Sequence, residues 1–433
     1  MKNLEQLLLI NKLRESENIR EYNDREYNEE FEIPLLIKKN QGSSTVLFRA
    51  SRTPFPIISN LFETREKFLK VFGFKNLEDF YRLVTDLKPE KDPYVEFDFD
   101  KYYEKSNYGL SKLGALKYYE KDGGFYFTST IFIAKTELSY NASIHRTMVI
   151  DDYSAVARIV PRHLYRIIEN NKSLGKDTKV TILLGAHPII ELVSSISPPY
   201  NQFEFELIPN LLGKKLPIVK SPLWNNPVPL GTSIIIEATI TNEMVNEGPF
   251  VDIMGTYDRI RKQPLIKING IYTLKEKPIA VHAILPGGGE HQLLMGITKE
   301  AQIYKAVSLV VPKVHKVRLT QAGGGWLHAA ISIDKNHDGD GKNAILAAFG
   351  AHPSLKHVVV VDGDVDIDDP NMIEWAIATR FQADRGLIVV KNARGSTLDP
   401  SANDGISAKM GIDATKPLNG SFIFERAKIP GEM

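Results

Sequence analysis

Cysteine is absent from this sequence of 433 residues. Disulfide bonds, zinc–thiolate sites, iron–sulfur clusters and cysteine nucleophiles are therefore excluded, and a metal ion can be bound only through oxygen or imidazole nitrogen. Runs of about 18 apolar residues are also missing, so no membrane span is predicted. Residues 1–22 have the spacing of an amphipathic helix but no apolar segment long enough for a signal peptide. These features are typical of a cytoplasmic protein.

An excess of charge of one sign is missing as well. The chain has 54 basic and 53 acidic residues, which gives a net charge of +1. This balance argues against a nucleic-acid-binding protein with a broad basic face. Apolar residues make up 43% and charged residues 25% of the sequence, which is ordinary for a globular protein. Because a single hydrophobic core rarely organises so long a chain, two or three domains are expected.

The apolar patterns predict a mixed α/β protein with three domains. Residues 1–110 alternate helical and strand patterns and form a predicted amino-terminal α/β domain, in which EIPLLIKK at 32–39 is expected to be a strand. Residues 111–300 contain many short β-branched or aromatic runs bounded by glycine, proline and asparagine, which predicts a barrel or sandwich. Residues 301–433 return to helices and buried strands and form a predicted carboxy-terminal α/β domain.

Four polar side chains interrupt or border the apolar runs of the central segment. They are Asn141 and Arg146 in NASIHR, His163 after a strand, and Glu237 inside SIIIEATI. Each needs a partner, because burying an unpaired polar or charged group is costly. One interpretation is an ion pair of Glu237 with Arg146 and a hydrogen bond of Asn141 with His163. The other is a Mn²⁺ or Mg²⁺ ion bound by amide oxygen, imidazole and carboxylate. The pattern leaves both open.

Glu290 follows three glycines in ILPGGGEHQLLMG, residues 284–296. The glycines allow the backbone to approach a ligand closely, and the apolar flanks predict that Glu290 is partly removed from water. A carboxyl group in such surroundings suits a proton donor. The alternative is a solvated glutamate in a flexible turn. Glu247 and Asp252, in NEGPFVDIMGTYD, are further carboxylates that could face a site, although loop carboxylates are usually solvated.

The segment VVVVDGDVDIDD, residues 358–369, places five aspartates at the end of a buried strand. Such a run invites a metal–phosphate interpretation. The alternation of the side chains also suits a solvated strand end followed by the amino-terminal cap of a helix. We favour this structural interpretation.

Several segments taken together resemble the UbiD family of decarboxylases, which use prenylated FMN. NASIHR resembles the family's Asn-x-x-Ile-x-Arg segment, and PRH, IIIEATI, EGPF, ILPGGGEHQLLMG and DVDIDDPNMIEWAIATR follow in the family's order. SAKMGIDAT, residues 407–415, resembles its Lys-Met-Gly-x-Asp-Ala-Thr tail. The resemblance spans most of the chain from about residue 130 onward. It implies an amino-terminal α/β domain, a central split β-barrel that binds flavin, and a carboxy-terminal α/β domain.

The resemblance implies a site for prenylated FMN and Mn²⁺, and it leaves K⁺ open as a further cation. Asn141, His163 and Glu237 would bind Mn²⁺ against the cofactor phosphate, which Lys409 would approach. Glu290 would protonate the substrate carbon, and Arg146 would hold the substrate carboxylate beside it. Many relatives have an Asp-Glu pair where this chain has Gly289-Glu290, so Glu290 is the candidate carboxyl of this loop. The residues implied in cofactor binding are Asn141, Ser143, Ile144, His145, Arg146, Arg162, His163, Glu237 and Lys409.

The resemblance also implies a substrate and partners. The chain looks most like the compact archaeal branch, whose members decarboxylate trans-anhydromevalonate 5-phosphate to isopentenyl phosphate. A flavin prenyltransferase would supply the cofactor, and the carboxy-terminal domain would form a homo-oligomer.

Two alternative functions stay open. The first is decarboxylation of an aromatic acid such as a 3-polyprenyl-4-hydroxybenzoate, whose long chain would need an apolar groove. A phosphorylated substrate would instead need additional lysine or arginine residues. The second is an FMN-binding reductase or flavin carrier, which would not need Glu290.

Overall fold

The computed structural model describes residues 19–429 except 277–279, 404, 420–421 and 428. These residues form two compact units. The first comprises the described residues up to Lys75 together with Leu87–Leu294, and the second comprises Asn76–Asp86 together with the described residues from Met295 onward. The predicted segments 1–110 and 111–300 therefore share one unit, apart from residues 76–86 and the last residues before 300.

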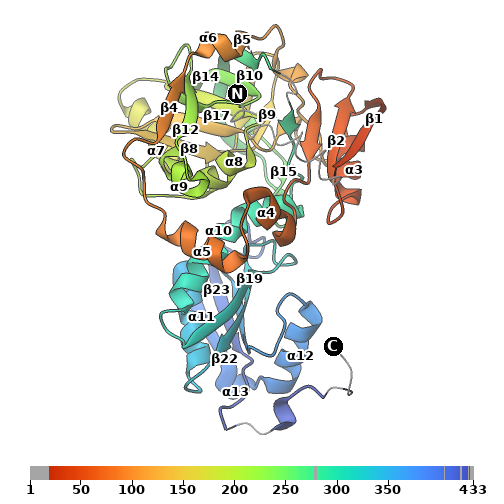
Figure 1. Ribbon diagram of the computed structural model, residues 1–433, viewed down its shortest axis with the longest axis vertical. Coiled ribbons are helices and arrows are strands. Elements are labelled where there is room, and N and C mark those ends of the chain that lie inside the picture. The colour runs from red at the N-terminus through yellow and green to blue at the C-terminus, as the bar shows by residue number, and fades with distance from the viewer. Residues whose placement is uncertain (1–18, 277–279, 404, 420–421, 428, 430–433) are drawn as a thin grey trace. The chain divides into compact units, whose positions relative to one another are not determined.

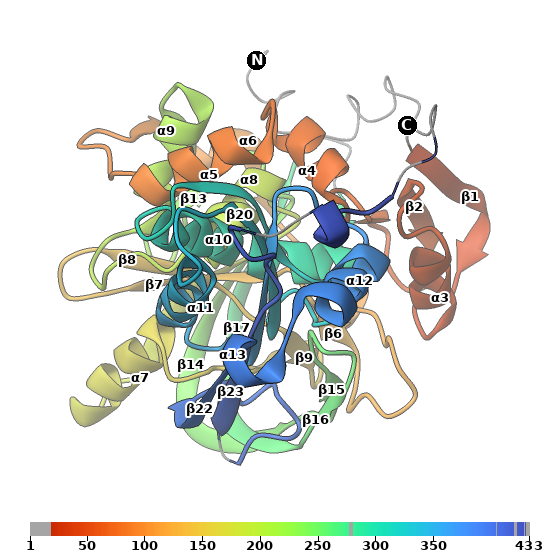
Figure 2. The ribbon, with the colours of Figure 1, turned by 90° about the horizontal axis from the view of Figure 1, so that it is seen from below.

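A four-stranded sheet of the first unit begins the described chain. Its strands, in spatial order, are β1 (Ile19–Tyr27), β2 (Thr45–Ala50), β3 (Ile57–Ser59) and β18 (Val281–His282). The helix α3 (Glu32–Lys39) lies beside β1 and β2 in Figures 1 and 2, and its Ile33 and Ile37 belong to the apolar cluster of this sheet. Strand β1 starts inside the helix predicted for residues 1–22, and the rest of that prediction lies outside the described residues.

The prediction of a strand at residues 32–39 is wrong, because these residues form α3. Ile33, Leu36 and Ile37 recur at helical spacing and therefore share one face of the helix. Pro34 stands in the first turn, where its missing N–H removes no helical hydrogen bond. The two lysines of the last turn interact favourably with the carboxy-terminal end of the helix dipole.

The larger sheet of the first unit has nine strands in the order β6-β9-β10-β17-β14-β11-β7-β8, with β5 paired to β17. The strands are β5 (Tyr103–Lys105), β6 (Tyr126–Phe127), β7 (Ile131–Lys135), β8 (Tyr140–Ile144), β9 (Thr147–Val149), β10 (Ser154–Ala157), β11 (Thr178–Leu184), β14 (Ile234–Glu247) and β17 (Arg261–Leu274). Only His145 and Arg146 separate β8, at one end of this order, from β9 near the other. Because so short a connection cannot cross a flat sheet, the sheet must curve until its two ends lie close together.

Short helices and two small sheets complete the first unit. The helices are α4 (Arg65–Phe72), α6 (Phe99–Tyr102), η1 (Leu110–Lys112), α7 (His163–Ser173), α8 (Pro188–Ser195), η2 (Glu204–Leu207) and α9 (Ile208–Leu212). The small sheets are β13 (Pro227–Pro229), β12 (Leu216–Lys220) and β4 (Tyr94–Phe97), and the pair β15 (Phe250–Val251) with β16 (Tyr257–Asp258). Helix α7 packs against β7, β8 and β11, and both α8 and η2 pack against β8. These contacts surround the strand that carries Asn141.

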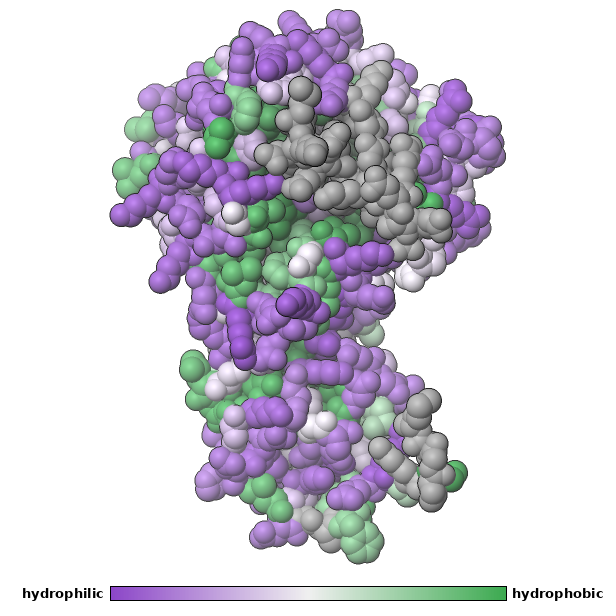
Figure 3. All heavy atoms as spheres, viewed as in Figure 1, coloured by the Kyte–Doolittle hydropathy of each residue, from purple (hydrophilic) through white to green (hydrophobic). Residues whose placement is uncertain are grey.

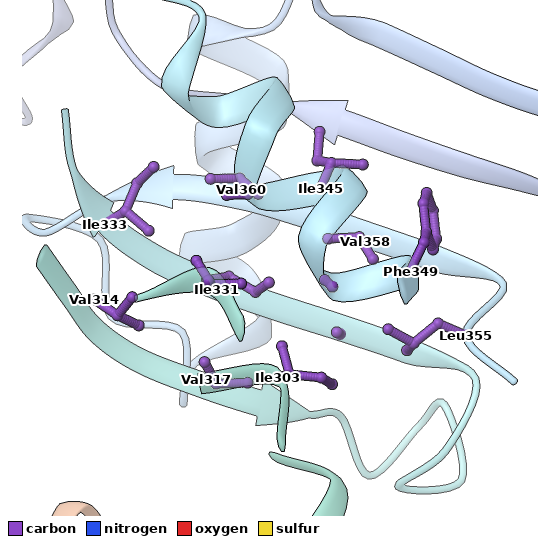
Figure 4. Close-up of a cluster of buried hydrophobic side chains, with 14 of the residues drawn as sticks. Ile303, Val314, Val317, Ile331, Ile333, Ile345, Phe349, Leu355, Val358 and Val360 are labelled. Atoms are coloured by element: carbon purple, nitrogen blue, oxygen red, sulfur yellow. The ribbon is translucent and has the colours of Figure 1, made fainter. Parts of the chain in front are cut away.

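The second unit is built on one five-stranded sheet. Its strands, in spatial order, are β19 (Lys313–Leu319), β20 (His328–Asp334), β21 (His357–Asp362), β23 (Ile406–Asp413) and β22 (Leu387–Arg394). Its helices are α5 (Leu77–Asp86), the later part of α10 (Gly289–Val307), α11 (Asp340–Ala351), α12 (Pro370–Arg380), α13 (Ala383–Gly386) and η3 (Phe422–Phe424). Figure 4 shows Ile345 and Phe349 of α11 above Val358 and Val360 of β21, in the main apolar core of this unit. Each such buried side chain contributes about 1.5–3 kcal/mol through the hydrophobic effect.

The aspartates of residues 358–369 have the structural roles that the sequence favours. Asp362 and Asp364 form ion pairs with Arg380 of α12. The Asp369 carboxylate caps α12 by accepting a hydrogen bond from the N–H of Asn371. The predicted helix cap is therefore confirmed, whereas Asp362, at the strand end expected to be solvated, is buried in its ion pair with Arg380.

The face of each unit that Figure 3 shows is largely hydrophilic, with apolar side chains in places. In the second unit, Leu387 and Val389 of β22 and Ile406 of β23 are exposed. The apolar face of α12, by contrast, is buried inside its own unit through Ile373 and Ala376. None of the helices in the described part of the chain has the length and apolar character that crossing a membrane requires.

Candidate active site

The buried amide of Asn141 finds its partner in a glutamate that the sequence interpretation missed. Asn141 lies in β8, and its Nδ2 donates a hydrogen bond of 2.8 Å to Oε1 of Glu204 in η2. The backbone N–H of Ala142 donates to the other carboxylate oxygen at 2.6 Å. Burial raises the pKa of Glu204 to about 8, although these two hydrogen bonds act in the opposite direction. Among the described residues, no lysine or arginine forms an ion pair with this carboxylate.

Ser143 and His145 fix the other end of the Asn141 amide. His145 Nδ1 lies 3.0 Å from the carbonyl oxygen of Arg158, so Nδ1 must carry the proton. Burial lowers the pKa of His145 to about 4, and the neutral ring therefore leaves Nε2 as an acceptor. The Ser143 hydroxyl lies 2.9 Å from Nε2 and donates a hydrogen bond of 3.2 Å to Oδ1 of Asn141. Because an amide oxygen has two lone pairs, Oδ1 keeps one of them for a cation.

Glu237 does not lie with Asn141. Its buried carboxylate accepts hydrogen bonds from the backbone N–H groups of Leu223 and Trp224, both at 2.8 Å. Strand register explains the separation, because Glu237 lies in the same cross-strand row as Ala142. Side chains alternate between the faces of a sheet, so Glu237 and Asn141 point to opposite faces. Neither of the partners predicted for Glu237, Arg146 or a metal set with Asn141, is supported by this geometry.

His163 is the first residue of α7, and Arg162 stands before it as the exposed amino-terminal cap. The imidazole lies 5.5 Å from the ring of Tyr200, at the start of the segment that leads to Glu204. Burial, together with the nearby positive charges of Arg162 and Arg166, lowers the pKa of His163. The ring is therefore neutral at physiological pH, as a metal ligand must be.

Arg146 binds three carboxylates, and none of them is Glu290. Its Nε and Nη2 donate to the two oxygens of Glu247 at 2.8 and 3.0 Å. Nη1 donates to Asp252 at 3.2 Å, and Nη2 also donates to Asp258 at 3.1 Å. Burial disfavours the charged guanidinium, but these carboxylates outweigh it and raise the pKa of Arg146. We call Arg146, Glu247, Asp252 and Asp258 the arginine–carboxylate cluster.

The carboxylates of this cluster differ in their access to solvent. The side chain of Glu247 is 0% exposed, that of Asp258 is 12% exposed, and that of Asp252 is 21% exposed. Asp252 is held by the N–H of Ile253, which donates to Oδ1 at 2.7 Å. Asp252 is thus the carboxyl that a ligand reaches most easily.

Glu290 lies in a different environment from the one predicted. It is buried at the start of α10, where it accepts hydrogen bonds from the backbone N–H groups of Leu61 at 2.6 Å, Asn60 at 3.0 Å and Phe62 at 3.2 Å. His282 Nε2 lies 3.2 Å from Glu290 Oε1 as a charge contact. The predicted pairing of Glu290 with Arg146 is therefore wrong. Its surroundings are those of a carboxylate that closes a turn of the backbone.

His282 joins Glu290 to a second buried glutamate. Its Nδ1 lies 2.8 and 2.9 Å from the two oxygens of Glu191 in α8. Burial disfavours the charged imidazole, but Glu191 and Glu290 outweigh it and raise the pKa of His282 to about 10. The three residues form a buried Glu–His–Glu triad.

The remaining predicted site residues occupy separate places. Ile144 ends β8 next to His145 and is half-buried. Lys409 lies in β23 of the second unit, where its Nζ donates to the backbone carbonyls of Pro353, at 2.6 Å, and of Leu355. Burial lowers the pKa of Lys409. Its approach to a cofactor phosphate stays a prediction.

Three family models match the chain over nearly its whole length. They describe 3-octaprenyl-4-hydroxybenzoate carboxy-lyase: its N-terminal domain matches residues 10–87, its Rift-related domain residues 93–289, and its C-terminal domain residues 292–414.

Two curated relatives bear the name anhydromevalonate phosphate decarboxylase. The relative from Aeropyrum pernix is 46% identical over 412 residues, which cover 94% of this chain and 93% of its own. The relative from Methanocaldococcus jannaschii is 40% identical over 412 residues, which cover 93% of this chain and 96% of its own.

Solved structures agree with the family models. The UbiD-class enzyme HmfF from Pelotomaculum thermopropionicum, in complex with FMN, has a TM-score of 0.91 and 34% identity, with 98% of this chain and 97% of that chain covered. An evolved dimeric form of HmfF in complex with prFMN has a TM-score of 0.88 and 32% identity, with 98% and 96% covered.

Together, fold and relatives define a decarboxylase of the carboxy-lyase class with a mixed α/β architecture, which confirms the predicted fold class. The chain belongs to the UbiD family.

Proposed function

We propose that this protein decarboxylates trans-anhydromevalonate 5-phosphate to isopentenyl phosphate, with prenylated FMN and Mn²⁺ as cofactors. The relatives of that name, at 46% and 40% identity over most of the chain, support the substrate. The FMN and prFMN complexes of the similar HmfF structures support the flavin. The observation that carries the chemistry is the arginine–carboxylate cluster, in which Arg146 holds the partly exposed Asp252.

Decarboxylation releases CO₂ and returns one proton to the carbon that carried it. When bound, prenylated FMN would supply the electron sink for the pair left behind. We assign the proton donor to Asp252 instead of Glu290, because Asp252 is the accessible carboxyl beside Arg146. Glu247 holds the guanidinium with two hydrogen bonds and so orients it. Arg146 can then attract the carboxylate of the substrate and keep Asp252 beside it.

Asn141 of β8, Glu204 of η2 and His163, which starts the helix α7 that packs against β8, have donors that fit a hard divalent cation such as Mn²⁺. Asn141 offers Oδ1, Glu204 offers a buried carboxylate without a cationic partner among the described residues, and His163 offers a neutral imidazole. Oxygen and nitrogen donors of this kind suit Mn²⁺. We therefore assign the metal carboxylate to Glu204 instead of Glu237. A cation at this position would compensate the buried charge of Glu204 and attract the phosphate of the flavin.

The proposed function is tested by reconstitution. Co-expression with a flavin prenyltransferase, the proposed supplier of the cofactor, should give a protein that releases CO₂ from trans-anhydromevalonate 5-phosphate and forms isopentenyl phosphate. A 3-polyprenyl-4-hydroxybenzoate serves as the comparison acid. Turnover of the aromatic acid alone would overturn the proposed substrate. Flavin reduction without release of CO₂ from either acid would favour a reductase.

A further inference from the structure

Two arginines lie directly opposite each other at the end of adjacent strands. The ladder of β9 with β10 pairs Thr147 with Ala157, and the next step pairs Arg146 with Arg158. The backbone N–H of Arg158 donates to the carbonyl of Arg146 at 3.2 Å, which confirms that the pairing continues. Residues paired in this way share one face of the sheet, where like charges destabilise it. The fold therefore maintains an unfavourable pair next to the arginine–carboxylate cluster.

Three guanidinium groups meet at the single carboxylate of Asp258. Arg146 donates to it at 3.1 Å, and Arg261 at the start of β17 binds it at 2.8 Å. Arg158 Nε lies 3.6 Å from Oδ2, a charge contact beyond hydrogen-bond length. Burial makes the charged form of Asp258 less favourable, but the three arginines outweigh it and lower its pKa. One carboxylate cannot saturate three guanidinium groups.

Arg158 has the most unused hydrogen-bonding capacity of the three. A guanidinium has five N–H donors. Within the described part of the chain, the hydrogen bond of the Arg158 side chain is a long one, 3.3 Å, to the carbonyl of Ile159. Its side chain is partly exposed, so its remaining donors are accessible to a ligand. Burial and repulsion by Arg261 and Arg146 lower the pKa of Arg158, which an anion at this place would counteract.

Charge balance points in the same direction. Glu247, Asp252 and Asp258 match the three arginines only when all three carboxylates are ionised. If Asp252 carries the proton that it is to deliver, three guanidinium groups face two carboxylates. The site then has an excess of positive charge that suits an anionic ligand.

We propose that Arg158 and Arg261 form a subsite for a phosphate monoester, which binds the phosphate end of the substrate while Arg146 and Asp252 act at its carboxylate end. Arginine suits this role because its planar N–H groups pair with phosphate oxygens. The proposal rests on the proposed function for the identity of the acid. A phosphate monoester has two sources here, the substrate and the flavin. The cation site at Asn141 and Glu204 already fits the flavin phosphate, so we assign this subsite to the substrate.

The test compares substrates on the holoenzyme of Arg158→Gln. The KM for trans-anhydromevalonate 5-phosphate should rise about 10- to 100-fold, with kcat changed much less, because a charge-assisted hydrogen bond is lost. The KM for the phosphate-free acid should stay at the wild-type value. Arg158→Lys keeps the charge without the planar fork and should restore part of the affinity. Arg49→Gln removes an exposed arginine paired with Glu26 elsewhere in the first unit and serves as the control. Arg261→Gln should repeat the effect of Arg158→Gln.

Inorganic phosphate provides a readout that does not depend on the identity of the acid. It should bind wild-type holoenzyme in calorimetry and bind Arg158→Gln at least tenfold more weakly. If the wild type does not turn over the phosphorylated acid, the proposed function fails, while this titration still tests the subsite. Equal KM values and equal phosphate binding in wild type and variant would overturn the subsite. Loss of flavin from Arg158→Gln, measured as flavin absorbance per chain, would overturn its assignment to the substrate.

Discussion

Replacing Glu290 with glutamine separates a structural role for this residue from a catalytic one. The carboxylate accepts three backbone N–H hydrogen bonds and faces the charged His282. Glutamine removes the negative charge and turns an NH₂ group toward at least one N–H donor. Breaking a buried ion pair on one side costs about 3–5 kcal/mol, and an unsatisfied buried N–H adds about 1–3 kcal/mol. Because Glu191 still compensates the charge of His282, the ion-pair contribution is smaller here, and we expect a total loss of about 3 kcal/mol, below the sum of the two lower limits.

The assay is thermal unfolding of matched holoproteins followed by circular dichroism. A loss of about 3 kcal/mol should lower Tm by roughly 6–12 °C for a unit of this size. Turnover of Glu290→Gln, measured well below its Tm, should stay within about threefold of wild type, since the loss of a positioned acid would cost about 10²–10⁴-fold. Asp252→Asn is the matched comparison. It should lose that larger factor in kcat with little change in Tm, because Asp252 is partly exposed.

The opposite pattern would refute this reasoning. If Glu290→Gln keeps the wild-type Tm and loses turnover by about 100-fold or more, Glu290 delivers the proton and the assignment of this role to Asp252 beside Arg146 is wrong. If Asp252→Asn keeps wild-type kcat, Asp252 is not the acid.

Glu204→Gln should lose bound Mn²⁺ and flavin together, because the metal carboxylate is removed, whereas Glu237→Gln should retain both. Elemental analysis and flavin absorbance measure the two contents, and stoichiometric Mn²⁺ in Glu204→Gln would contradict the assignment. The raised pKa of His282, about 10 against 6.5 for the free side chain, stabilises the fold fully below about pH 6.5, and this contribution is lost as the pH rises through 10. In denaturant unfolding, the free energy of unfolding should therefore fall more between about pH 8 and pH 11 for wild type than for His282→Asn. An equal fall in the two proteins would count against the charged triad. The second unit should form a homo-oligomer through the exposed apolar residues of β22, so light scattering should show a smaller assembly for Val389→Lys; a monomeric wild type at micromolar concentration would exclude this.

Local patterns predicted the strands around the site, but they failed where the partner comes from a distant part of the chain. Glu204 lies in NQFEFELIPN, a stretch without a strong periodic signal, and 63 residues separate it from Asn141. The burial of Glu290 was predicted correctly from its apolar flanks. Its donors belong to residues 60–62, about 230 positions earlier, and only the folded sheet brings them there.

The sequence interpretation came closer with the arginine–carboxylate cluster. Glu247 and Asp252 stand five positions apart in EGPFVD, and this segment also belongs to the family resemblance. The glycine run before Glu290 is the more conspicuous local signal, and it points to a different carboxyl group. The strand register determines which face of the sheet Glu237 occupies. One step along β14 moves a side chain to the other face, and local sequence patterns do not fix this step relative to Asn141.

The two compact units are not two successive stretches of chain. Helix α5 belongs to the second unit although it is made more than 200 residues before the rest, and the hydroxyl of its buried Tyr81 donates to the buried Glu300 at 2.6 Å. Glu300 in turn accepts the N–H of Leu319, so α5, α10 and β19 are joined through one carboxylate. A fragment that ends at residue 294 would keep α5 without its partners and expose Phe80 and Tyr81 to water. During synthesis, therefore, the apolar side of this early helix can be buried only after the last third of the protein has been made.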